Sequence, residues 1–354
     1  MNDPAFWRGR RVFVTGHSGF KGGWLSLLLH RWGAELHGFA LPAAQGSIFD
    51  SARIESLLAK STTGDIRDPD ALADAVARAE PEIVLHLAAQ PLVRDSYASP
   101  VETYAVNVMG TVHLLEAARR MPSVRAIVVV TTDKCYENRE WVWGYRETEA
   151  MGGHDPYSSS KGCAELVASA YRRSFLAEAG VCVATARAGN VIGGGDVSPD
   201  RLVPDLVRSI ARGERTLIRN PDAVRPWQHV LEPLSGYALL AERLCGETGE
   251  RFADGWNFGP DASGERSVGD VADAVCVAWN ENAAWDRDER VHPHEAHYLK
   301  LDSAKAVREL GWLPRWTFSR TVVETVAWYR AAAAVENLRD VTARQIDAYL
   351  DGDA

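Results

Sequence analysis

The sequence has no apolar run near the roughly 18 residues that a membrane-spanning helix requires. Its five cysteines are scattered and lack CxxC spacing, which argues against a disulfide framework and against a zinc site. Positive charge is also scarce, because 39 Lys and Arg face 48 Asp and Glu and leave a net charge of −9. These shortages predict no membrane partner, no nucleic-acid partner and a reducing compartment. The first residues, MNDPAFWRGRR, lack the apolar core of a signal peptide, so we expect a cytoplasmic protein.

What the sequence does contain is an alternation of short apolar runs and helical patterns. With 354 residues, of which 46% are hydrophobic and 25% charged, the chain is long enough for about two globular domains. Strands separated by helices form parallel sheets that are covered on both faces. The sequence therefore predicts an α/β fold with a doubly wound parallel sheet of the Rossmann type. Strands are predicted at 11–15, 36–41, 83–87, 126–131 and 181–186, and helices at 23–32, 70–79, 101–121 and 157–179.

The alternation ends near residue 190, where loops rich in Gly, Pro, Arg and Trp replace it. We expect a smaller C-terminal domain of mixed α/β structure that packs over the carboxyl edge of the sheet and binds the substrate. Residues 228–244 are predicted to form a helix that returns to the first domain. The predicted division is 1–187 plus about 226–247 for the domain of the parallel sheet, and about 188–225 plus 248–354 for the smaller, substrate domain.

A glycine motif, GHSGFKG at 16–22, lies directly between the first predicted strand and the first predicted helix. Glycines in this position let the backbone turn sharply and approach a pyrophosphate at a helix N-terminus, whose free N–H groups favour an anion. An ordinary glycine-rich turn is the alternative. Loops after two later strands would complete the dinucleotide site. The predicted cofactor contacts are Gly16, His17, Gly19, Phe20, Lys21, Gly22, Asp65, Ile66, Leu87, Ala88, Ala89 and Gln90, together with Tyr157 and Lys161.

The acidic residue that usually binds the cofactor ribose is missing from the end of the second predicted strand, which reads GFALP at 38–42. His17 and Lys21 are predicted to place positive charge near the ribose instead. This arrangement favours NAD as the cofactor, with NADP tolerated. The alternative is that both side chains point to solvent.

A second motif places Tyr157 and Lys161 four residues apart, on one face of a predicted helix. A nearby cation stabilises a phenolate, so Lys161 is predicted to lower the pKa of Tyr157 towards the range of a general base. Thr132 follows the predicted strand at 126–131 and is expected to hold a sugar hydroxyl together with Tyr157. These three residue types predict hydride-transfer chemistry at a hydroxyl group.

Together these residues resemble the extended short-chain dehydrogenase/reductase superfamily, whose members act on nucleotide sugars. The resemblance implies tightly bound NAD. It also adds Asn107 to the predicted cofactor contacts and implies that this residue makes structural and substrate-orienting hydrogen bonds. Within the superfamily, several segments resemble the CDP-glucose 4,6-dehydratase family. These segments are 12–27, 132–143, 153–165, 187–196 and 220–228 with the HVLEPL that follows.

This narrower resemblance implies a reaction. CDP-glucose is converted to CDP-4-keto-6-deoxy-D-glucose by oxidation at C4, loss of water across C5 and C6, and return of the same hydride to C6. The cofactor is regenerated in each turnover and needs no external oxidant. The product would feed the deoxyhexoses of surface polysaccharide such as O-antigen.

Asp133 and Lys134, directly after Thr132, bear on the choice of reaction. Elimination of water needs an acid for the leaving C6 hydroxyl and a base for the C5 proton, whereas epimerisation needs neither. Asp133 suits the acid. Related dehydratases carry Glu at the next position, where this chain has Lys134, and a lysine acts as a base only when it is neutral. A surface ion pair between the two side chains is the structural alternative.

Other functions stay open on the sequence alone. One is a nucleotide-sugar 4-epimerase, and another is a dehydratase acting on a different nucleotide hexose. A third is a non-enzymatic dinucleotide sensor. Asp133 and Lys134 argue against the epimerase, and the pair of Tyr157 and Lys161 argues against the sensor, because a sensor does not need a phenol with a lowered pKa.

Residues for the substrate are predicted in the second half of the chain. Asn190, with the glycines at 193–195, resembles the family's loop over the sugar and diphosphate. An acidic protein must gather its positive charge locally to bind a diphosphate. The candidates for this contact are Arg201, Arg219 and Arg225.

Three histidines near residue 295 raise the question of a metal site. They are His292, His294 and His297. Pro293 prevents their presentation on one helix, and no further set of carboxylate or histidine ligands is evident, so no metal is predicted.

The predicted helices at 101–121 and 157–179 are apolar on more than one face. Packing on a sheet uses one face of a helix, so the surplus predicts a homodimer through a helix bundle, as in relatives of the superfamily. Burial against the second domain is the alternative. The apolar positions of the first helix are Val101, Tyr104, Ala105, Val108, Met109, Val112 and Leu115.

Overall fold

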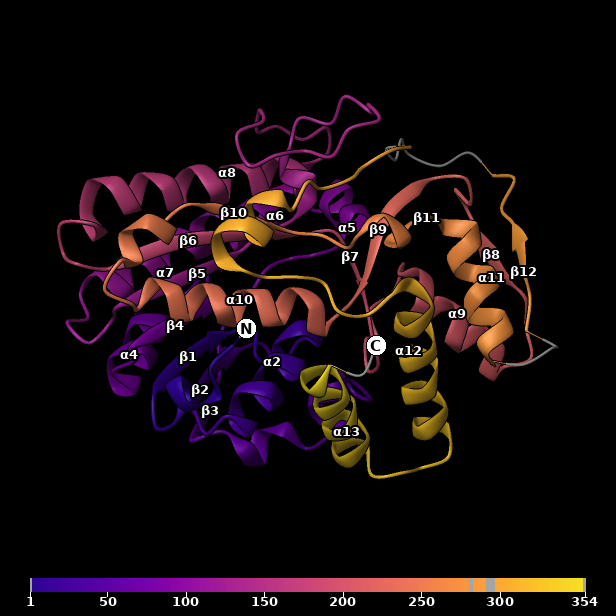
Figure 1. Ribbon diagram of the computed structural model, residues 1–354, viewed down its shortest axis with the longest axis horizontal. Coiled ribbons are helices and arrows are strands. Elements are labelled where there is room, and N and C mark those ends of the chain that lie inside the picture. The colour runs from indigo at the N-terminus through magenta and orange to yellow at the C-terminus, as the bar shows by residue number, and fades with distance from the viewer. Residues whose placement is uncertain (1, 280–282, 291–296, 353–354) are drawn as a thin grey trace.

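The computed structural model describes residues 2–279, 283–290 and 297–352. Its largest element is a sheet of seven strands in the order β10-β6-β5-β4-β1-β2-β3 (Figure 1). All of its strand pairs are parallel, and the chain reverses its progress across the sheet between β3 and β4. The predicted Rossmann-type fold is confirmed. The strands are β1 (Arg11–Thr15), β2 (Glu35–Ala40), β3 (Lys60–Thr63), β4 (Ile83–His86), β5 (Ala126–Val130), β6 (Cys182–Ala188) and β10 (Gly255–Phe258).

Helices cover both faces of this sheet, and each face has its own hydrophobic core. Successive strand residues enter different cores, so that Val12 and Val14 join one core while Phe13 joins the other. Both cores need apolar side chains, which explains why the strands lack polar alternation. The first core is covered by α2 (Phe20–Arg31) and α10 (Leu231–Leu244), the second by α4 (Pro69–Ala79), α7 (Gly110–Arg119) and α8 (Pro156–Tyr171).

The helix predicted at 101–121 is interrupted by a π-helical turn. The chain runs from α6 (Pro100–Tyr104) through the π turn η2 (Ala105–Met109) into α7. A π turn places one extra residue in the helix, and such turns are frequent at functional sites. Asn107 lies in this turn and is buried.

A smaller region with its own sheets lies beside the large sheet (Figure 1). It contains a three-stranded sheet, β11-β9-β7, and a two-stranded sheet, β12-β8. This region agrees with the predicted smaller mixed α/β part. Its elements are β7 (Asn190–Ile192), α9 (Leu202–Ala211), β8 (Thr216–Ile218), β9 (Val224–His229), β11 (Glu265–Ser267), α11 (Val268–Trp279), β12 (Trp285–Arg287) and α12 (Phe318–Ala333).

Two details differ from the predicted organisation. Gln228 is the penultimate residue of β9 and not the start of a helix, because the strand pairs with β7 through His229 and α10 begins only at Leu231. The large sheet also reaches further along the chain than residue 247, since β10 pairs with β6. The returning helix itself is present as α10, which packs on β5 and β6. The predicted domain boundaries stay a prediction.

The remaining short elements connect these layers. Among the described residues, none of the helices combines the length and the hydropathy that crossing a lipid bilayer requires. The last helix, α13 (Leu338–Asp351), lies against α2 and α3, and its Arg339 donates to the carbonyl of Ala52 (2.8 Å), which directly follows α3. The others are α1 (Pro4–Trp7), α3 (Ile48–Ser51), α5 (Val93–Ala98), the 3₁₀ turns η1 (Ile54–Leu57), η3 (Asp133–Cys135), η5 (Gly249–Phe252) and η6 (Ala262–Gly264), and the π turns η4 (Arg172–Leu176) and η7 (Ala306–Leu310).

A buried carboxyl group joins α10 to the C-terminal part of the chain. Glu232 Oε1 accepts a hydrogen bond from the backbone N–H of Trp316 (2.7 Å), and both of its oxygens accept from the N–H of Arg315 (3.1 Å). Its Oε2 accepts from the hydroxyl of Tyr349 (2.8 Å), in α13. Burial is the main cause that raises the pKa of Glu232 from 4.5 to about 7.

Replacing Glu232 by Gln is expected to change how stability depends on pH. Between pH 4.5 and about 7 the folded protein keeps a proton on Glu232 that the unfolded chain has released. The stability contributed by Glu232 is therefore complete below pH 4.5 and falls by about 1.4 kcal/mol per pH unit as the pH rises towards 7. Glu232→Gln lacks this decline. The free energy of unfolding of the wild type, relative to that of Glu232→Gln, should therefore fall from pH 5 to pH 7. Urea unfolding measures it, with the exposed Glu336→Gln as control, and a difference independent of pH would contradict the expectation.

Candidate active site

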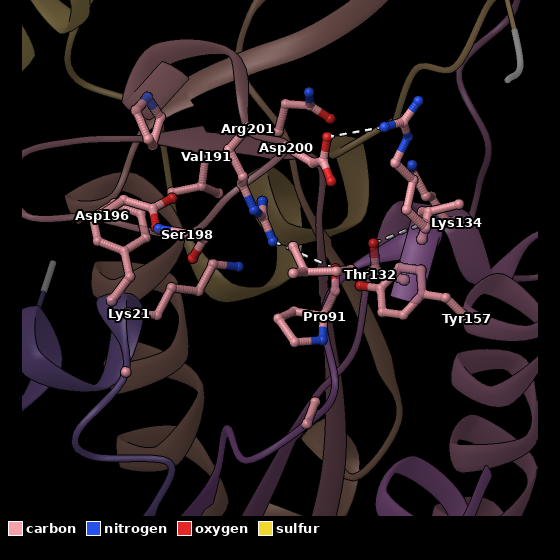
Figure 2. Close-up of a pocket in the computed structure, with 18 of the residues that line it drawn as sticks. Lys21, Pro91, Thr132, Lys134, Tyr157, Val191, Asp196, Ser198, Asp200 and Arg201 are labelled. Carbon is pink, nitrogen blue, oxygen red and sulfur yellow. Dashed lines mark hydrogen bonds and ion pairs between the residues drawn. The ribbon is translucent and has the colours of Figure 1, made fainter. Parts of the chain in front are cut away.

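A cavity of about 580 Å³, here called the cleft, opens where the carboxyl ends of the central strands meet the smaller region (Figure 2). Open α/β sheets bind their ligands in this crevice. All five residues predicted to be catalytic and all four predicted substrate contacts line the cleft. Of the predicted cofactor contacts, His17, Gln90 and Asn107 do not line it. The others do, namely Gly16, Gly19, Phe20, Lys21, Gly22, Asp65, Ile66, Leu87, Ala88 and Ala89, with Tyr157 and Lys161.

The glycine motif forms the tight turn between β1 and α2. Gly16 has a φ of +73°, and a Cβ on this residue would lie 2.7 Å from the backbone nitrogen of Ala88. A Cβ on Gly22 would lie 2.1 Å from the carbonyl oxygen of Gly16. The helix then starts at Phe20 with no side chain capping its first N–H groups. This bare, positively polarised turn fits the pyrophosphate of a dinucleotide.

The predicted positive charge of His17 near the ribose is wrong. Its ring fills the space above Gly38, where a Cβ would approach it to 2.4 Å, and its Nε2 lies 2.9 Å from the hydroxyl of Ser61. Burial lowers the pKa of His17 to about 4, so the ring is neutral at pH 7. The alternative, a ring in solvent, is wrong as well, because His17 is buried.

Lys21 points into the cleft, towards its catalytic end (Figure 2). Its Nζ donates to the hydroxyl of Tyr237 (3.3 Å), in α10. Burial, together with repulsion from Arg201 and Lys161, lowers the pKa of Lys21 to about 7, while Asp133 acts in the opposite direction. The charge of Lys21 is therefore coupled to Asp133, which follows β5, and to Lys161 on α8.

Asn107 connects the loop after β4 to α8 through hydrogen bonds. Its Oδ1 accepts from the backbone N–H of Gln90 (2.8 Å), and its Nδ2 donates to the carbonyl of Gln90 (3.1 Å). The same Nδ2 donates to the hydroxyl of Ser160 (2.8 Å), which precedes Lys161 in α8. Asn107 thus fixes the loop after β4 against the helix that carries Tyr157, in agreement with the structural hydrogen bonds that the resemblance implied.

The strand β5 delivers Thr132, Asp133 and Lys134 to the cleft, and we call these three residues the catalytic segment. Thr132 Oγ1 donates to Asp133 Oδ1 (2.9 Å), whereas Oδ2 of Asp133 is buried and accepts no hydrogen bond from the described residues. Burial raises the pKa of Asp133, and Lys134, Thr132 and Arg225 partly oppose this. Because Asp133 is only 1% exposed, a surface ion pair with Lys134 is wrong. A buried carboxyl group with a raised pKa and a free oxygen suits a proton donor.

Tyr157 and Lys161 lie on α8 and both line the cleft, but the predicted lowering of the tyrosine pKa is wrong. Burial raises the pKa of Tyr157 to about 12, although the Arg201 guanidinium and the hydrogen bond with Thr132 act against it. Lys161 is directed to the carbonyl of Val130 instead (3.4 Å). Burial also lowers the pKa of Lys161 to about 8, opposed by the charge of Glu165.

The predicted substrate residues lie at the side of the cleft that faces the smaller region. Arg225 is a buried residue of β9, and its charge favours the ionised form of Asp133. Arg201 directly precedes α9 and donates to the carbonyl of Pro91 (3.5 Å), in the loop after β4 (Figure 2). Asn190 begins β7. These side chains come from elements separated by long stretches of sequence.

Sequence analysis missed an ion-pair cluster at the mouth of the cleft. Asp200 Oδ1 pairs with Arg219 (3.3 Å) and with Arg94 of α5 (3.3 Å), so one carboxylate joins the two sides of the opening. It also missed the buried ion pair of Glu165 and Arg187 (2.7 Å) behind the catalytic segment. For Glu165 a signal was available, because it follows Lys161 by four residues on the same helix face.

Metal ligands were not expected from the sequence. Within the described ranges, no group of three or more His, Cys, Asp or Glu side chains is arranged to hold a metal ion. His292 and His294, which raised the question, lie outside the described residues, and His297 lies inside them.

Known proteins that resemble this chain include 4,6-dehydratases, which agrees with the geometry of the cleft. Residues 13–325 match the family model described as GDP-mannose 4,6 dehydratase. The chain is 53% identical to a CDP-glucose 4,6-dehydratase of Salmonella typhimurium, and the match covers 99% of each protein. It resembles the solved dTDP-glucose 4,6-dehydratase of Streptomyces venezuelae with NAD and TYD bound, at 26% identity and a TM-score of 0.77, over 92% of this chain and 98% of that one.

A second solved structure supports the fold alone. It is the dTDP-glucose 4,6-dehydratase of Bacillus anthracis in complex with NAD, at 22% identity and a TM-score of 0.78, over 94% of this chain and all of that one. The predicted resemblance is confirmed by the match to the family model and by the full-length identity to the Salmonella protein. The chain therefore belongs to the 4,6-dehydratase family of the extended short-chain dehydrogenases/reductases, and within it to the CDP-glucose 4,6-dehydratases.

Proposed function

We propose that this protein converts CDP-glucose to CDP-4-keto-6-deoxy-D-glucose, with NAD as the cofactor. The observation that carries this proposal is the buried carboxyl group of Asp133, whose Oδ2 has no hydrogen-bond partner among the described residues and which lies beside Thr132 at the end of β5. An epimerase has no use for such a proton donor. The identity to the CDP-glucose 4,6-dehydratase of Salmonella supports the choice of nucleotide.

The residues present fit NAD. The bare turn at Gly16 and Gly22 and the uncapped start of α2 would hold the pyrophosphate, and Ala88 lies directly against this turn. When bound, NAD supplies a hydride acceptor that also returns the hydride. His17 no longer supports the prediction that NADP is tolerated, because its neutral ring does not attract the additional phosphate of NADP.

Tyr157 and Thr132 act at the C4 hydroxyl of the sugar. Thr132 orients this hydroxyl, and Tyr157 removes its proton. Burial alone makes the phenol too weak an acid, so positive charge in the cleft has to favour the phenolate. Arg201 supplies part of this charge. The ammonium group of Lys161, in the same helix as Tyr157, is a further positive charge.

The catalytic segment carries out the elimination. Oxidation at C4 makes the C5 proton acidic, because the carbanion left behind is the enolate of the new ketone. Lys134, in its neutral form, takes the C5 proton, the C6–O bond breaks, and Asp133 gives its proton to the departing hydroxyl, which leaves as water. The raised pKa of Asp133 keeps this proton in place until it is needed.

Positive side chains on the substrate side neutralise the diphosphate. Arg201, Arg219 and Arg225 line the cleft, as does Asn190. Because Arg219 already pairs with Asp200, we infer that the diphosphate displaces this carboxylate when the substrate enters. The acidic chain thereby concentrates positive charge at one place.

Mass spectrometry of separate incubations with CDP-, dTDP-, UDP- and GDP-hexoses and NAD tests the proposed function. We expect loss of one water from CDP-glucose and not from the other nucleotides. Conversion without a change in mass would instead support a nucleotide-sugar 4-epimerase. No change in any incubation would leave a protein that binds a dinucleotide without turnover.

Asp133→Asn is expected to lower the rate of water loss by about 10²- to 10⁴-fold, because the amide does not protonate the leaving hydroxyl. Oxidation at C4 does not use this proton. A 4-keto sugar that has lost two hydrogens but retains its C6 hydroxyl should therefore accumulate on the enzyme, and mass spectrometry of quenched single turnovers detects it. Asp340→Asn, in α13, is the control. A variant that keeps more than half of the wild-type rate would exclude Asp133 as the proton donor.

We further propose a homodimer through the helices α6, α7 and α8. Apolar side chains are exposed on this face, and the alternative of burial against the smaller region does not account for them. They include Val101 of α6 and Leu166 of α8, together with Met109 and Phe175 in the adjoining π turns η2 and η4. A cytoplasmic location is part of the same proposal, supported by five cysteines that are all free.

Leu166→Glu is expected to weaken the dimer at least about tenfold, because it puts a charge into an apolar interface. Sedimentation equilibrium at micromolar concentration measures the association. The control is Val323→Glu in α12, where the exposed fraction of the side chain, 54%, is close to the 62% of Leu166. A monomeric wild type, or equal association of all three proteins, would contradict a dimer through this face.

A further inference from the structure

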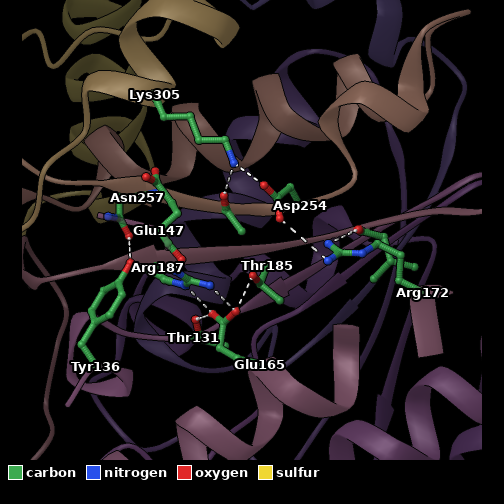
Figure 3. Close-up of polar contacts among 12 residues, drawn as sticks. Thr131, Tyr136, Glu147, Glu165, Arg172, Thr185, Arg187, Asp254, Asn257 and Lys305 are labelled. Carbon is green, nitrogen blue, oxygen red and sulfur yellow. Dashed lines mark hydrogen bonds and ion pairs between the residues drawn. The ribbon is translucent and has the colours of Figure 1, made fainter. Parts of the chain in front are cut away.

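A buried ion pair lies directly behind the catalytic segment. Arg187 of β6 donates from Nε and Nη2 to the two carboxylate oxygens of Glu165 in α8, at 2.8 and 2.7 Å (Figure 3). Thr131 donates to one of these oxygens, and Thr185 donates to the other (2.6 Å). Every contact of this carboxylate is thus made inside the protein, and both charged side chains are about 95% buried.

The ion pair holds the catalytic segment at both of its ends. Thr131, immediately before the segment, is bonded to Glu165. Tyr136, two residues after it, accepts a hydrogen bond from Arg187 Nη1 (2.7 Å) and donates to Asn257 Oδ1 (2.7 Å). Four residues lie between these anchors, and three of them, Thr132, Asp133 and Lys134, line the cleft, whereas Cys135 does not.

The same ion pair also fixes the helix that carries the other catalytic residues. Glu165 follows Lys161 by one turn and Tyr157 by two turns, on the same face of α8. A buried ion pair seldom increases stability over apolar residues of similar size, because both charges lose their hydration. Its cost is better explained by a requirement for exact placement.

We propose that Glu165 and Arg187 are positioning residues that fix the catalytic segment relative to Tyr157 and Lys161. Thr132 and Tyr157 have to reach one hydroxyl group while Asp133 and Lys134 reach the neighbouring carbons. A single rigid link between β5, β6 and α8 sets all of these distances at once. This inference rests on the proposed function.

Glu165 also acts on the charge of Lys161. The groups that face this ammonium are Cys135, His86 and Lys21, besides Glu165. Burial lowers the pKa of Lys161 to about 8, and the carboxylate of Glu165 is the largest influence that raises it again. Loss of the Glu165 charge should therefore lower the pKa of Lys161 and deprotonate it at a lower pH.

The test is the pH dependence of CDP-glucose dehydration by the holoenzyme and by two variants. For Glu165→Gln we expect kcat to fall roughly 10- to 100-fold with KM nearly unchanged, as for a small misplacement of catalytic groups. We also expect the alkaline limb of the kcat profile to move to lower pH. Tyr136→Phe removes only the second anchor and carries no charge, so kcat should fall without any shift of the limb. It remains informative if Glu165→Gln fails to fold.

Asp254→Asn is the matched control, because Asp254 forms ion pairs with Lys305 and Arg172 in the same polar cluster without touching the catalytic segment (Figure 3). It should lower the thermal midpoint and leave kcat and the alkaline limb unchanged. If Glu165→Gln and Tyr136→Phe only lose stability, as the control does, the positioning role is overturned while the proposed function stands. If the wild type removes no water from CDP-glucose, the proposed function fails and the inference fails with it.

Discussion

The carboxyl ends of β1, β4, β5 and β6 meet at one edge of the parallel sheet, and the whole site is assembled from the loops that leave this edge. Parallel pairing forces this arrangement, because each strand has to start again at the opposite edge after its helix. The reversal of strand order beside β1 opens the crevice into which these loops project. Residues far apart in the sequence, such as Gly16, Thr132 and Asn190, therefore line a single cleft. The smaller region closes the same edge from the other side.

Burial determines the acid–base properties of this cleft more strongly than any single charge pair. It raises the pKa of Asp133 and Tyr157 and lowers the pKa of Lys21 and Lys161. Each of these groups is thereby moved towards its neutral form. A phosphorylated substrate adds negative charge and alters this balance. The chemistry of the site thus depends on what the cleft contains.

The sequence predicts most of the fold because strand and helix patterns are local. The strand at 11–15 has the predicted ends, and the Tyr157–Lys161 spacing puts both residues in the cleft. What depends on three-dimensional packing was predicted less well. The neutral state of His17 follows from the space above Gly38, which no local pattern reveals. The links from Glu165 to Arg187 likewise arise only when α8 and β6 are in contact.

The late position of α10 and β10 in the chain has a consequence for synthesis on the ribosome. The face of β5 and β6 that α10 covers, and the edge of β6 that β10 pairs with, stay open until residues 231–258 have left the exit tunnel. An unpaired edge strand and an uncovered apolar face are the features that favour association with other chains. Most of the large sheet is therefore translated first, but the sheet is complete only after α10 and β10 have been made. Nascent chains ending near residue 187 are the ones that most need protection by a chaperone.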